Sequence, residues 1–207
     1  MVNFHALRLP AQALPRALEL RIDVELAPGD IERELGALHD RIGQPGDRLH
    51  AMPALPAGAP GLRLRYREAD GEYYVYVEDV MQRRLAGYTV FNRLIEVGRR
   101  ADPWVRAPHT KFAPAYQRRG LARALYRWAL EGGLCLLSGA RQSAGANALW
   151  QALAADHPMG YVDLRHKTLT WLGHAVDAPV REGLHTRMLL LGRGWTLDAF
   201  MARTGMY

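Results

Sequence analysis

The sequence is poor in cysteine and in long hydrophobic runs. Its 207 residues contain one cysteine, Cys135, which excludes a disulfide within them. The longest apolar runs, such as Met188 to Leu191, are too short to cross a bilayer. Prolines and arginines interrupt the first twenty residues, which is not typical of a secretory signal peptide. We therefore expect a single cytoplasmic domain, 1–207, with no membrane partner.

Lysine is almost absent as well. Lys111 and Lys167 are the only lysines, so arginine supplies nearly all of the formal net charge of +6. A basic surface can attract nucleic acid, acidic lipid or phosphorylated ligands, but an arginine bias is equally typical of a GC-rich genome. The basic residues are scattered in pairs and form no block of five or six like charges. A nucleic-acid partner is therefore not expected.

Hydrophobic periodicity predicts strands and helices that alternate in an α/β order. The expected strands are 18–26, a hairpin of 62–68 and 72–79 around Asp70-Gly71, 85–97, 103–114, 134–138, 161–165, 168–173 and 184–192. The expected helices are 30–42 with Asp30 as its cap, 115–131, 143–155 and a short C-terminal helix capped by Thr196. This order indicates one domain with a mixed, mostly antiparallel central sheet flanked by helices.

A proline- and glycine-rich stretch separates the first helix from the hairpin. Residues 43–61 (GQPGDRLHAMPALPAGAPG) contain four prolines, which argues against regular structure. A loop of this length in a compact domain is usually functional or disordered. We predict a lid or a wall of a ligand site; a disordered surface excursion is the alternative.

The stretch YQRRGLA, which begins at Tyr116, follows a strand and a proline and opens a helix. The first backbone N–H groups of a helix have no partner inside it and carry the positive end of its dipole, so they form an anion site. Gly120 has no Cβ, so a ligand can approach the backbone closely there. Arg118 and Arg119 add positive charge at the rim. This chemistry suits a pyrophosphate; a solvated basic helix start is the alternative.

The hexapeptide Gln117 to Ala122 (QRRGLA) resembles the Q/R-x-x-G-x-G/A signature of the GCN5-related N-acetyltransferases, abbreviated GNAT. The segment SAGANALW also resembles the N-x-x-A-x-x-L-Y pattern of that family, with Ala146 and Leu149 in matching positions, and LAGY at Leu85 resembles its third strand. The resemblance covers roughly Val75 to Tyr161, with the cofactor-binding core at about 85–161. It implies a single GNAT-like acyltransferase domain that moves an acetyl group from acetyl-CoA directly to a primary amine.

The family pattern implies roles for particular residues. The signature backbone would hold the pyrophosphate of acetyl-CoA through Gln117, Arg118, Arg119, Gly120, Leu121 and Ala122. A backbone N–H of the preceding strand, at Phe112 or Ala113, would stabilise the thioester oxygen as charge develops on it. The amine of the acceptor, a small molecule or a protein amine, would be the nucleophile, and no metal is required. A homodimer is a possible assembly.

Two positions depart from the pattern. The family asparagine falls on Ser143, which can still hydrogen-bond the pantetheine arm, and the family tyrosine falls on Trp150. Indole N–H is only a donor and does not act as an acid near neutral pH, so Trp150 is expected to form a wall of the pocket or part of the core. His109, on the strand before the signature, is then the first candidate base, and Tyr161 is a candidate acid. A backbone-bonded His109 is the alternative, with protons carried by water.

Two other functions are compatible with these features. One is a module with the same fold that binds acyl-CoA with little or no turnover, which the missing tyrosine favours. The other is nucleic-acid binding through arginines, which lacks a recognisable motif. Cys135 lies in an apolar strand and is expected to be a buried small hydrophobe, and Ser138 at the end of that strand is either structural or functional.

Overall fold

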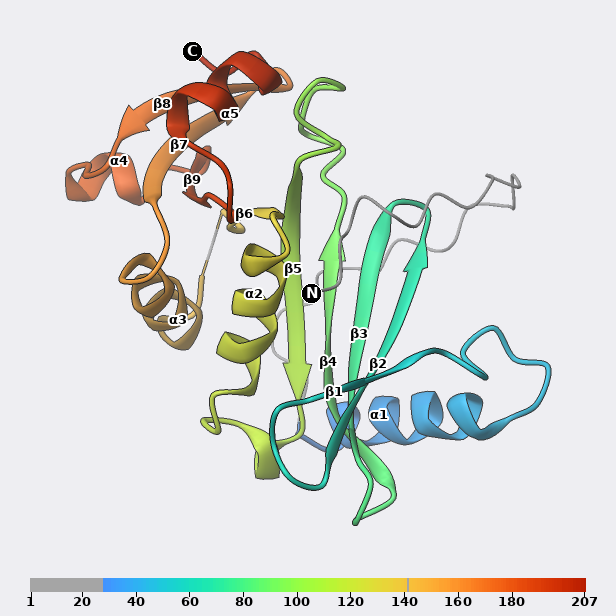
Figure 1. Cartoon of the computed structure of the whole chain (residues 1–207). Helices are drawn as coiled ribbons and strands as arrows, with labels where there is room; N and C mark the ends of the chain where they lie inside the picture. The colour runs from blue at the N-terminus through green and yellow to red at the C-terminus, as the bar shows by residue number, and fades with distance from the viewer. Residues whose placement is uncertain (1–27, 141) are drawn as a thin grey trace.

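The computed structural model describes residues 28–140 and 142–207, and the strand predicted for 18–26 lies outside them. The described residues form one nine-stranded sheet in the order β1-β2-β3-β4-β5-β6-β9-β7-β8 (Figure 1). The strands are β1 Ala54–Pro56, β2 Leu62–Ala69, β3 Glu72–Asp79, β4 Arg84–Asn92, β5 Val105–Phe112, β6 Cys135–Leu137, β7 Met159–Arg165, β8 Thr168–Gly173 and β9 Thr186–Leu190. Among the strand pairs of the described residues, only β5–β6 is parallel, which confirms a mixed, mostly antiparallel sheet.

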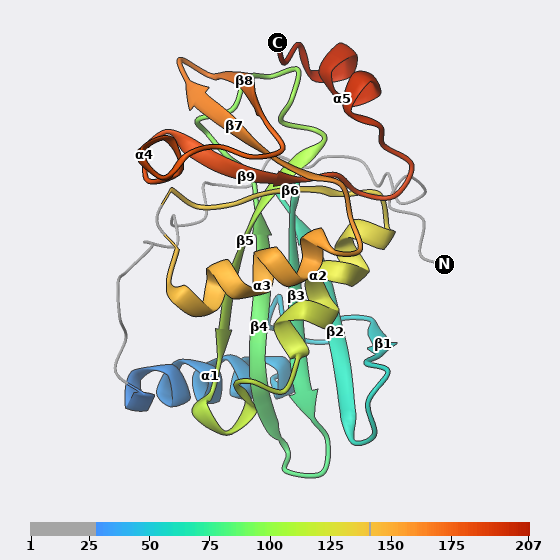
Figure 2. The same cartoon turned by 90° about the vertical axis from the view of Figure 1, so that its left-hand side faces the viewer.

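Helices cover both faces of this sheet. They are α1 Pro28–Gly43, α2 Leu121–Glu131, α3 Ala144–Ala154, α4 Ala178–Arg181 and α5 Leu197–Thr204, with a 3₁₀ turn at Pro114–Tyr116. Helices α2 and α3 lie side by side on one face (Figure 2). Side chains alternate across a strand, and on β5 Thr110 contacts Tyr126 of α2 whereas Lys111 contacts Glu34 of α1. Helix α1 therefore packs on the opposite face.

Two hydrophobic clusters stabilise the domain. The larger one joins α1, α2 and α3 to strands β2–β4 and includes the fully buried Val75, Phe91, Leu130 and Leu153. The smaller one lies between the sheet and α5, around Phe200. Cys135 is fully buried there, as expected of a small hydrophobe, and burial raises the pKa of its thiol to about 12. None of the helices within 28–140 and 142–207 has the length and apolar character needed to cross a membrane.

Several predicted element boundaries are wrong. The first helix begins at Pro28, so Asp30 lies in its first turn and accepts a hydrogen bond from Arg33 instead of capping the helix. The strand predicted for 85–97 ends at Asn92, and the helix predicted from 115 begins at Leu121. The stretch 43–61 contains the short edge strand β1, and its Leu49 and Met52 are buried in the larger cluster.

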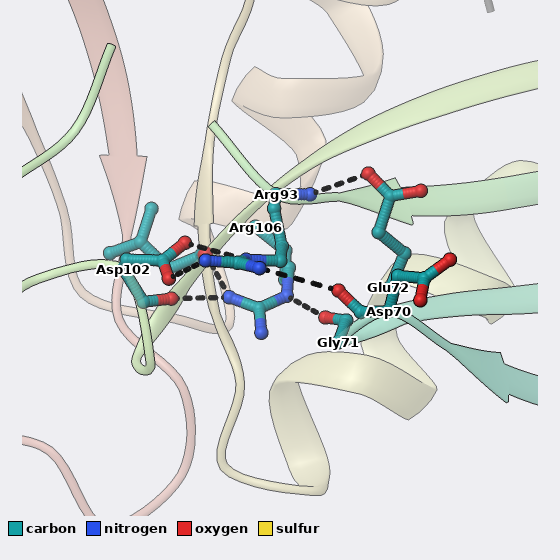
Figure 3. A network of polar contacts seen from close by, with 7 residues as sticks. Asp70, Gly71, Glu72, Arg93, Asp102 and Arg106 are labelled. Carbon is teal, nitrogen blue, oxygen red and sulfur yellow. Dashed lines mark hydrogen bonds and ion pairs between the residues drawn. The ribbon is translucent and has the colours of Figure 1, made fainter. Parts of the chain in front are cut away.

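A polar network ties the β2–β3 turn to the β4–β5 connection (Figure 3). Arg106 is 4% exposed and donates to the carbonyl oxygens of Gly71, Asp102 and Val105, at 2.5–2.8 Å. Arg93, half exposed, forms an ion pair with the Asp102 carboxylate at 2.5 Å. Desolvation lowers the pKa of the Arg106 guanidinium, whereas the Asp102 carboxylate hydrogen bond raises the pKa of Arg93. The network fixes two connections that are far apart in sequence.

Candidate functional site

The strands β5 and β6 separate soon after they meet. Their parallel pairing, among the described residues, consists of Val105 with Cys135 and Arg106 with Leu136. From position 107 onward, β5 continues to pair with β4 on its other side, as far as Phe112. Among the described residues, one edge of β5 therefore has no strand partner over 107–112. The backbones of β5 and β6 diverge there (Figure 1), and we call the region between them the gap.

Backbone groups of β5 point alternately to β4 and to this gap. The N–H of Ala113 donates to the carbonyl of Ala86 at 3.0 Å, so this amide is already engaged with β4. By alternation, the N–H groups of Phe112 and Thr110 point toward the gap. The prediction for the thioester oxygen therefore narrows to Phe112, and Thr110 offers a second donor that the sequence analysis missed.

The start of α2 presents free backbone donors beside the gap. Gly120 is the residue before the helix, with φ +76°, and its carbonyl accepts the helical hydrogen bond of the Ala124 N–H at 2.9 Å. The N–H groups of Leu121, Ala122 and Arg123 therefore lack an intrahelical acceptor, and no side chain caps them. A Cβ at Gly120 would have no atom within 4 Å, so the space in front of these donors is open. This geometry fits an anion such as a pyrophosphate.

Tyr116 anchors this loop, and the sequence analysis did not identify its role. Its hydroxyl donates to the Asp79 carboxylate at 2.7 Å and accepts from Arg84 Nε at 3.1 Å. The guanidinium groups of Arg84 and Arg119 each lie 5.2 Å from the Tyr116 ring centroid. Gln117 also holds the loop, since its Nε2 donates to the Phe112 carbonyl at 3.0 Å. Arg118 is exposed, with φ +58°.

The predicted contacts Ser143 and Trp150 belong to α3, which lies beside α2 on the same face of the sheet (Figure 2). Ser143 is the N-cap of α3, and its Oγ accepts a hydrogen bond from the Ala146 N–H at 3.2 Å. Its hydroxyl can still donate to a ligand. Trp150 is 3% exposed and packs edge to face against Tyr126, with 6.3 Å between ring centroids. It therefore lies in the core behind the gap, where its indole cannot supply a proton.

His109 lies on β5, on the face of the sheet that α1 covers. It is half-buried and pairs with Val90 of β4. Burial lowers the pKa of its imidazole below 6.5, the positive charge of Lys111 lowers it further, and Glu34 opposes this. The Glu34 carboxylate accepts from Tyr88 at 2.5 Å and from Lys111 at 2.8 Å. The lowered pKa keeps the His109 imidazole neutral at pH 7, as a general base must be before it accepts a proton.

Tyr161 lies on β7, on a different strand from His109. It lines a cavity of about 440 Å³ together with Ser138, which follows β6, and residues of α3, α4 and β9. The strands β6 and β9 lie between β7 and β5 in the sheet, and His109 does not line this cavity. Ser138 is held structurally, because its Oγ accepts from the Met188 N–H at 2.9 Å and donates to the Gly139 carbonyl. No group of three or more potential metal ligands occurs among the described residues.

No family model matches the sequence, and no curated protein matches it. Solved structures that resemble the chain include a chimera of the spermidine N-acetyltransferase SpeG from Vibrio cholerae and hSSAT, at 18% identity over 80% of this chain and 92% of that one, with a TM-score of 0.35. A GNAT superfamily phosphinothricin acetyltransferase from Sinorhizobium meliloti, in complex with AcCoA, matches at 18% identity over 60% and 63%, with a TM-score of 0.37.

A third similar structure is RimL, a ribosomal alpha-N-protein acetyltransferase in complex with coenzyme A, at 10% identity over 71% of this chain and 99% of that one, with a TM-score of 0.40. All three of these proteins are acetyltransferases. These scores describe a coarse likeness, and the function proposed below depends on the geometry of this chain.

Proposed function

We propose that the chain is an acetyl-CoA-dependent N-acetyltransferase that transfers an acetyl group directly to a primary amine. The observation that carries this proposal is the juxtaposition of the uncapped start of α2, at Gly120, with the unpaired edge of β5. The first feature suits a pyrophosphate. The second offers backbone donors and acceptors to an extended arm that contains amide groups, as a third strand would.

Different residues of the chain would bind the coenzyme, stabilise the oxyanion and transfer protons in such a reaction. The N–H groups of residues 121–123 would bind the pyrophosphate, with positive charge from Arg118 and Arg119 at the rim. The N–H of Phe112 or Thr110 would stabilise the developing oxyanion. The bound coenzyme supplies the activated acetyl thioester. His109 would hold the proton that the amine gives up, and water or Tyr161 would protonate the departing thiolate.

The first test is calorimetric titration of the protein with acetyl-CoA and with coenzyme A at moderate salt. We expect dissociation constants on the order of micromolar, within the range of ordinary enzyme–substrate affinities. Release of coenzyme A in the presence of a panel of primary amines then tests turnover. Absence of binding by the intact protein would contradict the proposal.

A second prediction concerns pH. Because burial and Lys111 lower the pKa of His109, the neutral base persists below pH 6.5, and kcat/KM should fall only as the pH drops through this lowered pKa. His109→Gln should lower kcat about a hundredfold or more and remove this acid limb. Lys111→Met, which removes a positive neighbour, should move the limb to higher pH. His166→Gln, on an exposed turn, is the control. If the acid limb of the pH profile is the same in all of these variants, His109 is not the base.

One observation favours the alternative of a binding module without turnover. Trp150, at the position of the family tyrosine, is buried in the core. If no other group protonates the thiolate, the chain binds acetyl-CoA and turns it over poorly. Binding of acetyl-CoA without release of coenzyme A for any amine tested would support this alternative.

A further inference from the structure

The cavity that Tyr161 lines is formed by the end of β6, the start of α3, strands β7 and β9, and the short helix α4. The residues from α4 and β9 lie outside the segment that resembles the family. The cavity volume of about 440 Å³ lies in the range of small-molecule sites. Ser138, which lines it, follows β6 directly, and β6 borders the gap along β5. A ligand in the cavity would therefore lie beside the gap.

Arg181 gives this cavity a positive side, whereas the guanidinium of Arg187 lies toward a neighbouring cavity that Glu96 and Leu184 line. The Arg187 side chain is only 9% exposed, and its Nη1 donates to the carbonyls of Leu184 and Thr186. Its carboxylate partner, Glu96, is 57% exposed and 3.5 Å away, so the buried charge is weakly balanced. Arg181, at the end of α4, forms no ion pair with any other described residue. Guanidinium groups bind carboxylates well.

The same cavity also offers acceptors to a hydrogen-bond donor. Gln142 Oε1 is buried and has no hydrogen-bond partner among the described residues, while its Nε2 contacts Met188 Sδ at 3.5 Å. A buried acceptor without a partner destabilises a protein unless a ligand or water satisfies it. Glu182, the residue after α4, adds a carboxylate to the lining. An amine of a ligand would satisfy both groups.

We propose that this cavity binds the acceptor, and that the acceptor is a small amino acid whose primary amine and carboxylate lie close together. This inference rests on the function proposed above. The carboxylate would pair with Arg181, and the amine would face Gln142 and Glu182 before it reaches the gap. A polyamine or a protein lysine lacks the carboxylate, and the guanidinium of Arg181 repels additional positive charge.

The bonds and protons balance when an amino acid accepts the acetyl group. The amine nitrogen forms a bond to the acetyl carbonyl carbon, and the carbon–sulfur bond breaks. The nitrogen loses one proton to a base at the gap, and the thiolate gains one, which leaves an N-acetylamino acid and free coenzyme A.

The test compares acceptors that differ only in the carboxylate. Release of coenzyme A is measured with leucine against isoamylamine, with phenylalanine against phenethylamine, and with spermidine. We expect kcat/KM for the amino acid to exceed that of its paired amine by at least about tenfold. Arg181→Gln should remove this preference, mainly through KM, and Arg181→Lys should restore part of it. Arg83→Gln, an exposed arginine in the β3–β4 turn, is the matched control.

Gln142→Leu supplies a second readout that does not depend on turnover. Removing an unsatisfied buried acceptor should leave the melting temperature of the free protein unchanged or raise it, while the binding of leucine, measured calorimetrically without acetyl-CoA, weakens. A merely structural glutamine would instead lower the melting temperature and leave binding unchanged.

Equal or better turnover of the paired amines or of spermidine, with acetyl-CoA binding intact, would overturn the amino-acid inference and leave the proposed function standing. If acetyl-CoA does not bind, the proposed function fails, and the acceptor inference fails with it. The calorimetric titration of acetyl-CoA therefore distinguishes the two failures.

Discussion

The Gly120→Glu variant should bind acetyl-CoA at least about a hundredfold more weakly than the unaltered protein, a loss of roughly 3 kcal/mol. The substitution places a negative charge and a long side chain in the open space before the free N–H groups of α2. The carboxylate would occupy the anion site itself and repel a pyrophosphate. Calorimetric titration with acetyl-CoA measures the effect directly.

The left-handed backbone at position 120 requires a matched control. At φ +76° a residue with a Cβ costs about 1–2 kcal/mol of stability, so weaker binding could reflect local strain. Gly194 has φ +88° and likewise no atom within 4 Å of a Cβ position. Gly194→Glu should therefore carry the same strain and charge with unchanged affinity. Unchanged affinity in Gly120→Glu as well would show that the pyrophosphate binds elsewhere.

Arg106→Ala should destabilise the fold by about 3–5 kcal/mol. The substitution leaves the carbonyls of Gly71, Asp102 and Val105 without their guanidinium donor in a buried region (Figure 3). The guanidinium also lies 5.4 Å from the ring centroid of Tyr73, a contact that alanine cannot replace. The midpoint of urea unfolding, followed by circular dichroism, gives the change in free energy.

Arg93→Ala is the comparison for this variant. Arg93 belongs to the same network and forms an ion pair with Asp102 at 2.5 Å, but its side chain is 50% exposed. Solvent-exposed pairs contribute about 1 kcal/mol or less, so Arg93→Ala should be several-fold milder. Equal effects of the two substitutions would mean that the buried carbonyl contacts of Arg106 are not what stabilises these connections.

Local signals in the sequence predicted the elements whose ends are fixed by local chemistry. The Asp70-Gly71 turn joins β2 and β3 with Ala69 opposite Glu72, because both turn residues adopt positive φ. Thr196 caps α5, as expected, through a hydrogen bond from the Ala199 N–H. These features depend on a few neighbouring residues, so no knowledge of the tertiary fold is needed.

Errors arose where a distant contact decides the structure. The apolar pattern continues past Asn92, which suggested a longer strand, but Leu94 and Val97 pack in a turn against the smaller core cluster. The predicted helix from 115 begins later because Arg118 and Gly120 both have positive φ. Helix formation cannot pass through such residues.

The candidate site was predictable only in part. The signature loop is contiguous, so its residues could be named from the sequence. The cavity beside Tyr161 combines Gln142, Arg181 and Arg187, which lie on three elements that only the sheet order brings together. No short motif links these positions. The two predicted proton-transfer residues, His109 and Tyr161, lie on separate strands for the same reason.

The order of strands in the sheet has a consequence for how the chain folds. Strands β2, β3, β4 and β5 pair with their neighbours in sequence, so their contacts close short loops. Strand β6 must instead pair with β9, about fifty residues further along the chain, and loop closure over such a span is slower. We expect the β2–β5 meander to form early and the β6–β9 half to assemble on it. The gap that would receive the coenzyme thus lies between the β2–β5 strands, which form early, and the β6–β9 strands, which form late.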